Sequence, residues 1–579
     1  MRKTKVVIID SGVCKSSLAG NKITESYVLN KDKENWRIDI EESTDLLGHG
    51  TAVASIINSI NENVEIIPIR IYNENSDIDE SALIYSLEYV LENIEADIIN
   101  VSAGVVYLEQ YNLMNEVCKK ITEKGILIIS AFDNDGAISF PAACDSVVGV
   151  DVFNDYNYKN DLVLLENNIV QVLVPNKYFK VEWLNKKNLI KGTSFACAYV
   201  TGLISKTLER PFSIKNIEQI ITERKIYNNS LSIKGPDFDI KKAIIFPVNK
   251  EAHALLRFKE YLDFEIIDVF DDPICGKIGT EVYGYKVKSF EQLDWGGGFD
   301  TVILSCNEDL SRIRQVNYKD LIIEKAKKYN KNIYSFEDIR CENEKFFYPS
   351  ITKENVPMNS LKLYKSTIPV VSVFGTSSKQ GKFTLQQKLI NELKKMGYNV
   401  GSISTEPSGY LLGSDYVFHF GYHADLNLHP WETIGILNKM IWEVGISGKD
   451  IMITGCQSGT IHYDNSHINN FALIQHSFIL GTLADMYILC INPHDDISYI
   501  EKTINYLNSI DVGKVCMIVV FPIKIVETKS GIGYGYKEMM EDEKSDLLDR
   551  LQQKFHIPVF FMNDDCIEAI CQNIINFFT

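Results

Sequence analysis

The sequence predicts an α/β protein in which parallel sheets are flanked by helices, arranged in three successive regions. Short apolar strands alternate with amphipathic helices along almost the whole chain, which is the rhythm of parallel sheets covered by helices. With 579 residues, the chain is too long for a single hydrophobic core. No short-period repeat or low-complexity segment interrupts the pattern.

The first predicted region covers residues 1–246. A proline ahead of an amphipathic run predicts a terminal helix over residues 211–225. Residues 235–244 are interpreted as a last turn and helix before a boundary near 246–250. We expect strands at residues 5–10, 64–72, 96–104, 125–132 and 146–153, and helices at 51–60, 81–94 and 111–125.

Two further α/β regions follow. Residues 247–350 predict a small Rossmann-like domain, but they lack a GxGxxG motif, so dinucleotide binding is not supported. Residues 351–579 predict a P-loop nucleotide-binding domain, because a glycine-bounded loop separates an apolar strand from a helix. The strands expected here lie at 265–270, 300–306 and 368–375, the helix at 383–397, and a helix followed by a strand over 318–336.

The composition argues against two classes of partner. The formal net charge is −18, whereas nucleic-acid binding needs a basic surface. No apolar run reaches membrane-spanning length, and no signal peptide is apparent, because the first residues run directly into a strand. The twelve cysteines are scattered without a CxxC pair, which indicates a reducing compartment and hence a cytoplasmic protein. The sequence leaves open whether the chain forms a homo-oligomer.

Three separated segments place an aspartate, a histidine and a serine at the ends of apolar elements. Asp10 ends a strand, His49 lies between two glycines at the start of a helix, and Ser194 opens a helix after Gly192 and Thr193. A serine hydroxyl is a weak nucleophile that needs a base, and the base needs a carboxylate to hold its tautomer. The order Asp, His, Ser is that of the subtilisin-type triad. The three segments together therefore predict a serine peptidase.

Residues 1–246 resemble the subtilases, the subtilisin-like serine peptidases, beyond these three segments. The strand IINVSAG is similar to the family strand that pairs with the substrate backbone, which implies that Ser102, Ala103 and Gly104 bind substrate. The segment ILIISAFDNDG is similar to the family loop that carries the oxyanion asparagine. This resemblance implies that Asn134 donates its side-chain amide to the oxyanion of the tetrahedral intermediate.

The resemblance has departures that bear on specificity and control. The family usually has a glycine just before the oxyanion asparagine, whereas this chain has Asp133. We expect Asp133 to lie at the pocket for the substrate residue before the cleaved bond (P1) and to favour lysine or arginine there. Secreted members carry an inhibitory pro-segment ahead of the first strand, but Asp10 is the tenth residue here. We therefore expect narrow substrate choice or another part of the chain to restrain activity.

A second motif, GTSSKQGKFT, lies between the strand and the helix of the third region. Backbone N–H groups of such a loop cradle phosphates, and a lysine neutralises their oxygens. Five residues separate the two glycines, rather than the four of an ordinary Walker A motif, and a phenylalanine stands where serine or threonine is usual. We predict that ATP or another nucleotide, with Mg²⁺, binds to Gly375, Thr376, Ser377, Ser378, Lys379, Gln380, Gly381, Lys382, Phe383 and Thr384.

This loop resembles that of dethiobiotin synthetase and, more closely, that of a bacterial P-loop family of unknown function. Some members of that family are linked to D-glutamate and dipeptide metabolism, and it pairs a small Rossmann-like domain with the P-loop domain. The family tends to carry a glutamate at the end of the strand IMITG, where this chain has Thr454 and Gly455. The candidate magnesium ligands are therefore Thr384, Glu406 and Asp415.

Together these patterns predict an intracellular subtilisin-like serine endopeptidase fused to a P-loop nucleotide-binding region. Ser194 would attack the carbonyl, His49 would carry the proton, and Asp10 would orient His49; this chemistry needs no cofactor. The predicted substrate is a specific peptide or protein, with leader removal during peptide maturation as one form. Two alternatives stay open: an ATP-dependent ligase or kinase-like enzyme with a regulatory peptidase part, and a nucleotide-gated switch.

Overall fold

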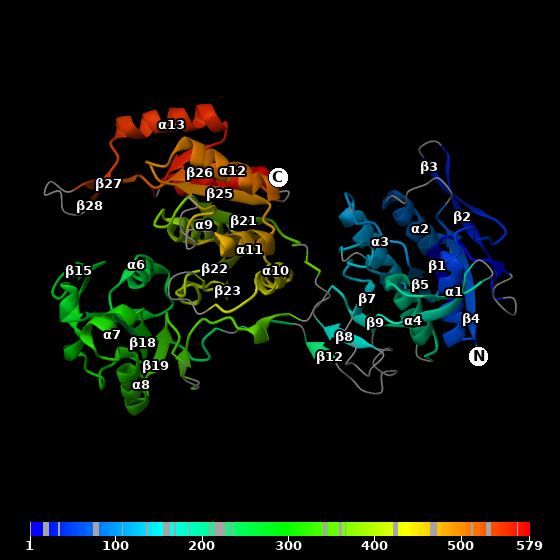
Figure 1. Cartoon of the computed structure of the whole chain (residues 1–579), viewed down its shortest axis with the longest axis horizontal. Coiled ribbons are helices and arrows are strands. Elements are labelled where there is room, and N and C mark those ends of the chain that lie inside the picture. Colours follow the sequence, from blue (N-terminus) through cyan, green and yellow to red (C-terminus); the bar gives the residue numbers. More distant parts are fainter. Residues whose placement is uncertain are drawn as a thin grey trace. The chain divides into compact units, whose positions relative to one another are not determined.

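The computed structural model of the chain divides into two compact units (Figure 1). The first comprises Met1–Ser230 with Met358–Tyr364, and the second comprises Leu231–Pro357 with Lys365–Thr579. The structure describes residues 2–15, 22–32, 35–72, 80–106, 108–134, 137–153, 162–166, 169–183, 186–207, 210–213, 226–228, 230–231, 233, 235–339, 343, 345–357, 362–364, 366–420, 426–463, 472–510, 513–527, 534–563 and 565–579.

The first unit is built on a mostly parallel sheet with helices on both faces; among the described strands of this sheet, only the pairs β2–β3 and β8–β9 are antiparallel. Within the described residues its main sheet has ten strands, in the order β12-β8-β9-β7-β6-β5-β1-β4-β2-β3. The elements are β1 (Thr4–Asp10), β2 (Tyr27–Asp32), β3 (Asn35–Ile40), α1 (His49–Ile60), β4 (Val64–Arg70), α2 (Glu80–Asn93), β5 (Ile98–Val101), α3 (Tyr111–Glu123), β6 (Leu127–Ala131), β7 (Val148–Phe153), β8 (Val163–Glu166), β9 (Val172–Pro175), β10 (Phe179–Trp183), β11 (Lys186–Ile190), α4 (Thr193–Ser205) and β12 (Ile226–Asn228).

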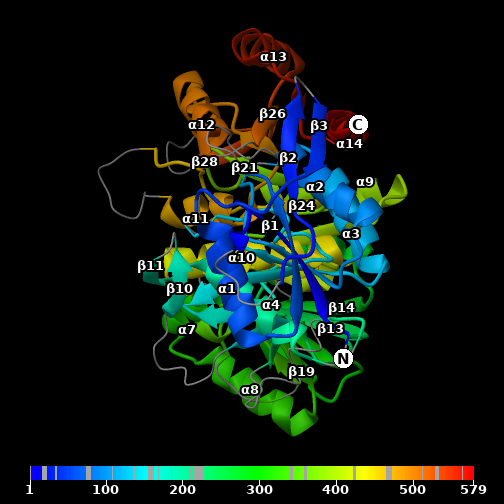
Figure 2. The same ribbon diagram turned by 90° about the vertical axis from the view of Figure 1, so that its right-hand side faces the viewer.

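Alternate residues of the central strand β1 enter two separate cores. Val6 and Ile8 pack with α1 and α4 on one face, while Val7 and Ile9 pack with α2 and α3 on the other. Figure 2 shows α1 and α4 side by side on their face of the sheet, where they pack against each other. Because β1 is parallel to both β4 and β5, the carboxyl ends of these strands share one edge, which is where Asp10 lies.

The second unit contains two parallel sheets. Its elements up to residue 357 are β13 (Lys242–Phe246), α6 (Lys250–Leu256), η2 (Lys259–Tyr261), β14 (Glu265–Asp271), η3 (Pro273–Cys275), β15 (Glu281–Val282), β16 (Tyr285–Lys286), β17 (Lys288–Ser289), η4 (Phe290–Gln292), β18 (Thr301–Leu304), α7 (Glu308–Arg314), α8 (Tyr318–Tyr329), β19 (Asn332–Ser335), β20 (Phe346–Phe347) and η5 (Lys353–Asn355). Among the described residues they form a six-stranded sheet, in the order β17-β14-β13-β18-β19-β20.

The second sheet of this unit is formed by the remaining residues. Its order within the described residues is β23-β22-β24-β21-β25-β26-β29, with the P-loop strand β21 at the centre. The elements are β21 (Val370–Gly375), α9 (Lys382–Lys395), β22 (Val400–Ser404), η6 (Tyr410–Leu412), β23 (Tyr416–Val417), α10 (Pro430–Ile446), β24 (Ile451–Gly455), α11 (Leu473–Thr482), β25 (Met486–Ile491), α12 (Ile497–Ile510), β26 (Lys514–Val520), β27 (Ile523–Glu527), β28 (Tyr534–Glu538), α13 (Glu541–Phe555), β29 (Val559–Phe561) and α14 (Cys566–Phe578).

The secondary structure near residue 246 differs from the one that the sequence predicts. Residues Lys242–Phe246, of which the first three are expected at the end of a helix, form β13 and lie between β14 and β18 in the sheet of the second unit. A short apolar run cannot be assigned to strand or helix by periodicity alone, and here burial between two parallel neighbours decides it. The two later regions, expected as separate domains, form one compact unit, and residues 362–364 belong to the first unit.

The other strands and helices predicted from the sequence are present, with ends shifted by a few residues. Both units are therefore α/β, as expected. The helix predicted over residues 211–225 lies almost entirely outside the described residues. Among the described helices, none combines the length and apolar character that crossing a bilayer requires.

Candidate functional site

Asp10 and His49 are joined at the edge of the first unit's sheet. The Nδ1 atom of His49 lies 2.8 Å from Oδ1 and 3.0 Å from Oδ2 of Asp10. Helix α1 begins at His49, after Gly48 in the left-handed region with φ of 81°. A Cβ on Gly50 would lie 2.1 Å from the carbonyl oxygen of Gly12, so only glycine lets the helix start this close to the strand end. The buried carboxylate thereby fixes one nitrogen of the imidazole.

The turn before α1 is held by a second carboxylate, that of Asp45. It accepts hydrogen bonds from the Gly48 N–H at 2.7 Å, the Thr51 N–H at 2.8 Å and the Ser11 hydroxyl at 2.9 Å. Burial by itself lowers the pKa of His49, but the charge and hydrogen bond of Asp10 and the charge of Asp45 outweigh it, so this pKa is raised. Two carboxylates thus favour the protonated imidazole, as a proton-accepting base requires.

Ser194 lies in the first turn of α4, on the helix that packs against α1. Its hydroxyl donates to the carbonyl oxygen of Ser102 at 3.1 Å. No hydrogen bond joins Ser194 to His49, both of which the structure describes. Rotation about the Cα–Cβ bond of a serine moves its hydroxyl between staggered positions, and catalytic hydrogen bonds commonly tighten only when substrate is bound. The serine side chain is 7% exposed.

Two aromatic rings border the imidazole of His49. The ring of Phe195 has its centroid 5.2 Å from that of His49, and the indole of Trp183 meets it edge to face at 6.0 Å. Trp183 is the last residue of β10, in the hairpin that precedes α4, and β10 packs on α1. These rings limit the directions in which the imidazole can turn, because aromatic edge-to-face contacts favour one geometry.

Asn134 is oriented by the start of α4. Its Oδ1 atom accepts hydrogen bonds from the N–H of Thr193 at 2.9 Å and from the Thr193 hydroxyl at 3.1 Å. An N–H group can only donate, so the amide oxygen must face it and the NH₂ group points elsewhere. Gly192 has φ of 142°, and a Cβ there would lie 2.9 Å from this oxygen. The glycine before Thr193 is thus required for Asn134 to keep its place.

The three residues after β5 form an open edge beside Ser194. The Ser102 hydroxyl donates to Oδ1 of the buried Asn100 at 2.9 Å, and the amide of Asn100 donates to the Thr201 hydroxyl on α4 at 2.8 Å. Ala103 is buried and Gly104 is exposed. The backbone that the sequence predicts to bind substrate is therefore linked to α4 and is exposed at Gly104, where an extended peptide strand could be added.

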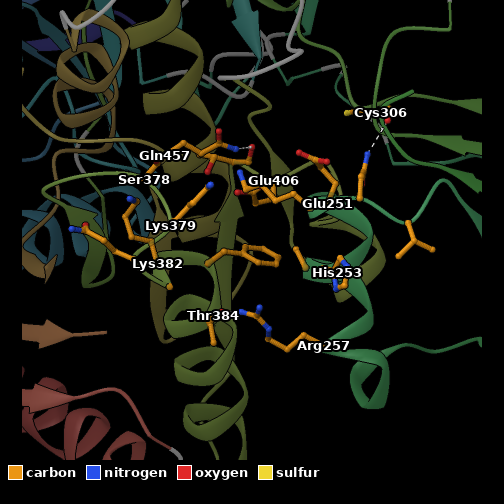
Figure 3. Close-up of a pocket in the computed structure, with 18 of the residues that line it drawn as sticks. Glu251, His253, Arg257, Cys306, Ser378, Lys379, Lys382, Thr384, Glu406 and Gln457 are labelled. Atoms are coloured by element: carbon orange, nitrogen blue, oxygen red, sulfur yellow. Dashed lines mark hydrogen bonds between the residues drawn. The ribbon is translucent and has the colours of Figure 1, made fainter. Parts of the chain in front are cut away.

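The second unit contains a cavity of about 1010 Å³. The P-loop lines one side of it, and α6 with the residues after it lines the other (Figure 3). Figure 3 shows Arg257 and Thr384 pointing toward each other, and the Arg257 Nη1 atom donates to the Thr384 hydroxyl at 2.6 Å. The cationic side chains on its walls are Lys250, Arg257, Lys277, Lys379 and Lys382.

The P-loop is closely packed around Lys382, the first residue of α9. The ammonium group of Lys382 donates to the carbonyl oxygen of Ser377 at 2.5 Å, and burial lowers the pKa of this lysine. A Cβ on Gly375 would lie 2.5 Å from Oε1 of Gln380, and Gly381 has φ of 73°. A buried lysine, a helix start and glycines that admit no side chain are the donor set that holds phosphate oxygens. The residues present fit the phosphate group of a nucleotide.

Other predicted P-loop residues stabilise the loop from within. The Thr376 hydroxyl donates to the Asp495 carboxylate and accepts from the Gln380 amide at 2.5 Å. The Ser377 N–H donates to Gln380 Oε1 at 3.0 Å. Ser378 and Lys379 are exposed and line the cavity. The ring of Phe383 packs edge to face against Phe258, with centroids 6.0 Å apart.

Two of the three candidate magnesium ligands line the cavity, and the third does not. Thr384 and Glu406 line the cavity, and burial raises the pKa of Glu406, opposed by the charges of Lys250 and Lys382. Asp415 does not line it: its Oδ1 lies 3.3 Å from the ammonium of Lys449 and its Oδ2 accepts the Ser402 N–H. Asp415 is therefore not part of the cavity. Among the described residues, no three His, Cys, Asp or Glu side chains are grouped as metal ligands.

At the end of β24 this chain has Gly455, where the resembled P-loop family tends to have a glutamate, and a steric contact explains the glycine. A Cβ on Gly455 would lie 2.5 Å from Oε1 of Gln386, whose amide donates to the carbonyl oxygens of Ile403 and Ile453. Thr454 is buried and its hydroxyl shares a 2.5 Å hydrogen bond with Ser372. A carboxylate at residue 455 would therefore collide with a glutamine that ties β22 to β24.

Two family profiles match the chain. The profile described as "Subtilase family" matches residues 1–231, and the one described as "Domain of unknown function (DUF1611_C) P-loop domain" matches residues 358–571. Residues 1–231 are a subtilase domain. The later match is a P-loop domain of the second family. Homologues in the subtilase family are serine endopeptidases.

Among curated proteins, the chain is similar to Minor extracellular protease Epr of Bacillus subtilis, with 25% identity over 235 residues, which cover 38% of this chain and 34% of that protein. It is also similar to Subtilisin-like protease 3 of Saccharomyces cerevisiae, with 26% identity over 225 residues, covering 32% and 45%. The chain thus spans less than half the length of either relative. A solved structure of a DUF1611 family protein from Anabaena variabilis is 13% identical, with a TM-score of 0.41, covering 58% of this chain and all of that one.

Two residues that act on His49 were not singled out from the sequence. Asp45 precedes His49 by four residues in TDLLGHGT. An aspartate ahead of a glycine-containing turn often accepts hydrogen bonds from the backbone of that turn, so this pattern could have indicated its role. Trp183 had none, because nothing local ties a hairpin tryptophan to a histidine more than a hundred residues earlier.

Proposed function

We propose that the subtilase domain is a serine endopeptidase with Asp10, His49 and Ser194 as its catalytic triad. The contact of both Asp10 oxygens with Nδ1 of His49 carries this proposal, because it leaves Nε2 as the nitrogen that can accept a proton. The Ser194 oxygen bonds to the scissile carbonyl carbon while its proton passes to Nε2. His49 then gives that proton to the leaving amine, which leaves an acyl group on Ser194. Water gives a proton to His49 and attacks the acyl carbon, and His49 returns the proton to Ser194 as the acid product leaves.

The negative charge that develops on the carbonyl oxygen needs donors that are already in place. The NH₂ group of Asn134 and the backbone N–H of Ser194 are these donors in the proposal, supported by the two hydrogen bonds that turn Asn134 Oδ1 toward Thr193. Ser194 lies in the first turn of a helix, where backbone N–H groups and the helix dipole favour an anion.

Substrate binding in this proposal is by strand addition along Ser102, Ala103 and Gly104. Asp133 stands next to the oxyanion donor and would favour lysine or arginine at P1. The substrate is a specific peptide or protein, and removal of a leader during peptide maturation is one form of such processing. A library of peptides varied at P1 tests the specificity, and a preference for large apolar residues would reject the role of Asp133.

Proteome-wide cleavage profiling tests the endopeptidase proposal. Cell extracts treated with the wild-type chain should gain new peptide termini that extracts treated with the Ser194→Ala variant do not. The termini should share a sequence pattern if the enzyme is selective. Identical termini from both proteins would contradict the proposal, because they would arise from another peptidase in the extract.

A second function is favoured by the cavity beside the P-loop. We propose that it binds ATP or another nucleotide, with the phosphates at Lys382, Lys379 and the N-terminus of α9, and that Mg²⁺ accompanies it near Thr384 and Glu406. When bound, Mg²⁺ would neutralise phosphate charge. An ATP-dependent ligase or kinase-like activity is the alternative reading of the whole chain. Phosphate release that survives Ser194→Ala but not Lys382→Ala would support it.

A reducing, cytoplasmic location is also part of the proposal. Cys118, Cys197 and Cys490 are buried thiols without disulfide partners. Buried free cysteines behave as small apolar side chains and are typical of proteins kept reduced. Thiol counting with and without reductant on protein taken directly from cells tests this point.

A further inference from the structure

Lys362 is part of the peptidase unit, although it lies far beyond residue 231, where the subtilase match ends. Lys362 is 3% exposed, and Tyr364, two residues later, is 1% exposed. The P-loop strand β21 begins at Val370. The chain therefore returns to the first unit and buries a lysine there just before it enters the P-loop fold.

The ammonium group of Lys362 contacts the loop that carries Asn134. Its Nζ atom donates to the carbonyl oxygen of Ala137 at 3.1 Å and to that of Asp133 at 3.4 Å. These two carbonyls lie on either side of Asn134 in the chain. The same ammonium group thus binds the backbone on both sides of Asn134. Moving Asp133 or Ala137 away from Lys362 would break a charge-assisted hydrogen bond.

A buried carboxylate holds this ammonium group in place. Oδ2 of Asp151, on β7, lies 3.4 Å from Nζ of Lys362, and both side chains are almost fully buried. The Asp151 Oδ1 atom accepts the N–H of Val152 at 2.8 Å, so the carboxylate itself is fixed to the strand. The ring of Phe132, the residue after β6, has its centroid 5.3 Å from the same ammonium. A buried charge needs such partners, and their positions set where it lies.

We propose that Lys362 is a positioning residue for the oxyanion site of the subtilase domain. The lysine anchors the loop on one side through the Asp133 and Ala137 carbonyls, while Thr193 anchors Asn134 Oδ1 on the other. Peptidase chemistry therefore depends on a residue that the chain supplies from outside the subtilase domain. This inference rests on the proposed function, because it needs Asn134 to act as the oxyanion donor.

The test follows the rate at which a fluorophosphonate probe labels Ser194 in the full-length chain. The phosphonyl oxygen uses the same donors as a peptide oxyanion, so Lys362→Met should lower the maximal labelling rate on the order of tenfold to a hundredfold and leave the half-saturating probe concentration nearly unchanged. Lys362→Arg, which keeps the cation, should recover part of the rate. Lys119→Met, an exposed lysine on α3, is the matched control and should label like the wild type.

Coupling to Asn134 separates positioning from a general structural role. Asn134→Ala alone should lower the labelling rate about 10²- to 10³-fold. If Lys362 acts through Asn134, then Lys362→Met should cost little more in the Asn134→Ala background, because the residue it positions is gone. Two independent effects, which multiply in the double variant, would overturn the proposal.

A further variant tests whether Lys362→Met lowers the labelling rate only because it destabilises the fold. Lys362→Met leaves Asp151 as a buried charge without its lysine, so the melting temperature should fall. The double variant Lys362→Met/Asp151→Asn removes both charges and should recover much of the melting temperature while its labelling rate stays low. Recovery of the rate together with stability would overturn the proposal. If the wild type fails to label, or Ser194→Ala labels equally well, the proposed function fails and this inference falls with it.

Discussion

The carboxylate of Asp45, four residues before His49 in the chain, influences the pKa of the His49 imidazole. It fixes the backbone that begins α1, and its charge joins that of Asp10 in raising the pKa of the imidazole. In the proposed mechanism His49 must be neutral to take the Ser194 proton, so we expect activity to be lost as the pH falls through this raised pKa. The acid limb of the pH profile therefore lies above the position that an ordinary histidine would give.

We expect Asp45→Asn to move that acid limb to lower pH, because the variant removes a negative charge that favours the protonated imidazole. The maximal rate should also fall, on the order of tenfold, since the Thr51 N–H and hydroxyl lose an acceptor that holds the start of α1. The fluorophosphonate labelling rate of Ser194 measured across pH reports both changes.

The control for this variant is Glu116→Gln, which removes an exposed carboxylate of α3 that pairs with Lys120. It should leave the profile unchanged, because a solvent-exposed charge away from the site is screened. An acid limb that stays in place in Asp45→Asn, or that moves to higher pH, would contradict the electrostatic account of His49.

The residues that could be predicted from the sequence are those whose neighbours in the chain explain them. Asp10, His49 and Ser194 each stand at an element end with glycines that the local geometry requires, as the close contacts of Gly50 show. Lys362 has no such signal. Its role follows from carbonyls and a carboxylate more than two hundred residues earlier in the chain. Lys362 is bound by carbonyl oxygens that are far away in the chain, and such contacts leave no recognisable pattern in the residues next to the lysine.

At the level of elements, the strand–loop–helix unit β21–α9 carries the nucleotide proposal. Lys382→Ala should weaken binding of a fluorescent ATP analogue by about ten- to a hundredfold, because it removes a charge-assisted hydrogen bond to phosphate. Equilibrium titration of the full-length chain measures this.

Lys395→Ala, at the exposed end of the same helix, is the control, and its affinity should equal that of the wild type. Unchanged affinity in Lys382→Ala would show that the nucleotide, if bound, does not use this loop. Asp415, expected from the sequence as a magnesium ligand, does not line the cavity, and its carboxylate is held by Lys449 and by the Ser402 N–H.

Element identity was predictable wherever an apolar run was long or clearly periodic. Strands β1, β4 and β21 and helices α2 and α9 follow from such runs. Strand β13 was missed because the five residues KAIIF carry no periodic signal, and only the neighbours β14 and β18 make them a strand.

For the whole molecule, the proposal separates the two chemistries. The peptidase steps use groups of the first unit only, so ATP with Mg²⁺ should leave the labelling rate of Ser194 unchanged in the wild type and in Lys382→Ala. Labelling that rises or falls several-fold with ATP in the wild type, and does not in Lys382→Ala, would favour the nucleotide-gated switch instead.

Mass spectrometry of the chain labelled with a fluorophosphonate locates the adduct and so tests the proposed triad. We expect a single modified residue, Ser194, and loss of the modification in His49→Ala, because the serine is then without its base. An unmodified Ser194, or an adduct that forms equally fast in His49→Ala, would contradict the assignment of these residues as a catalytic triad.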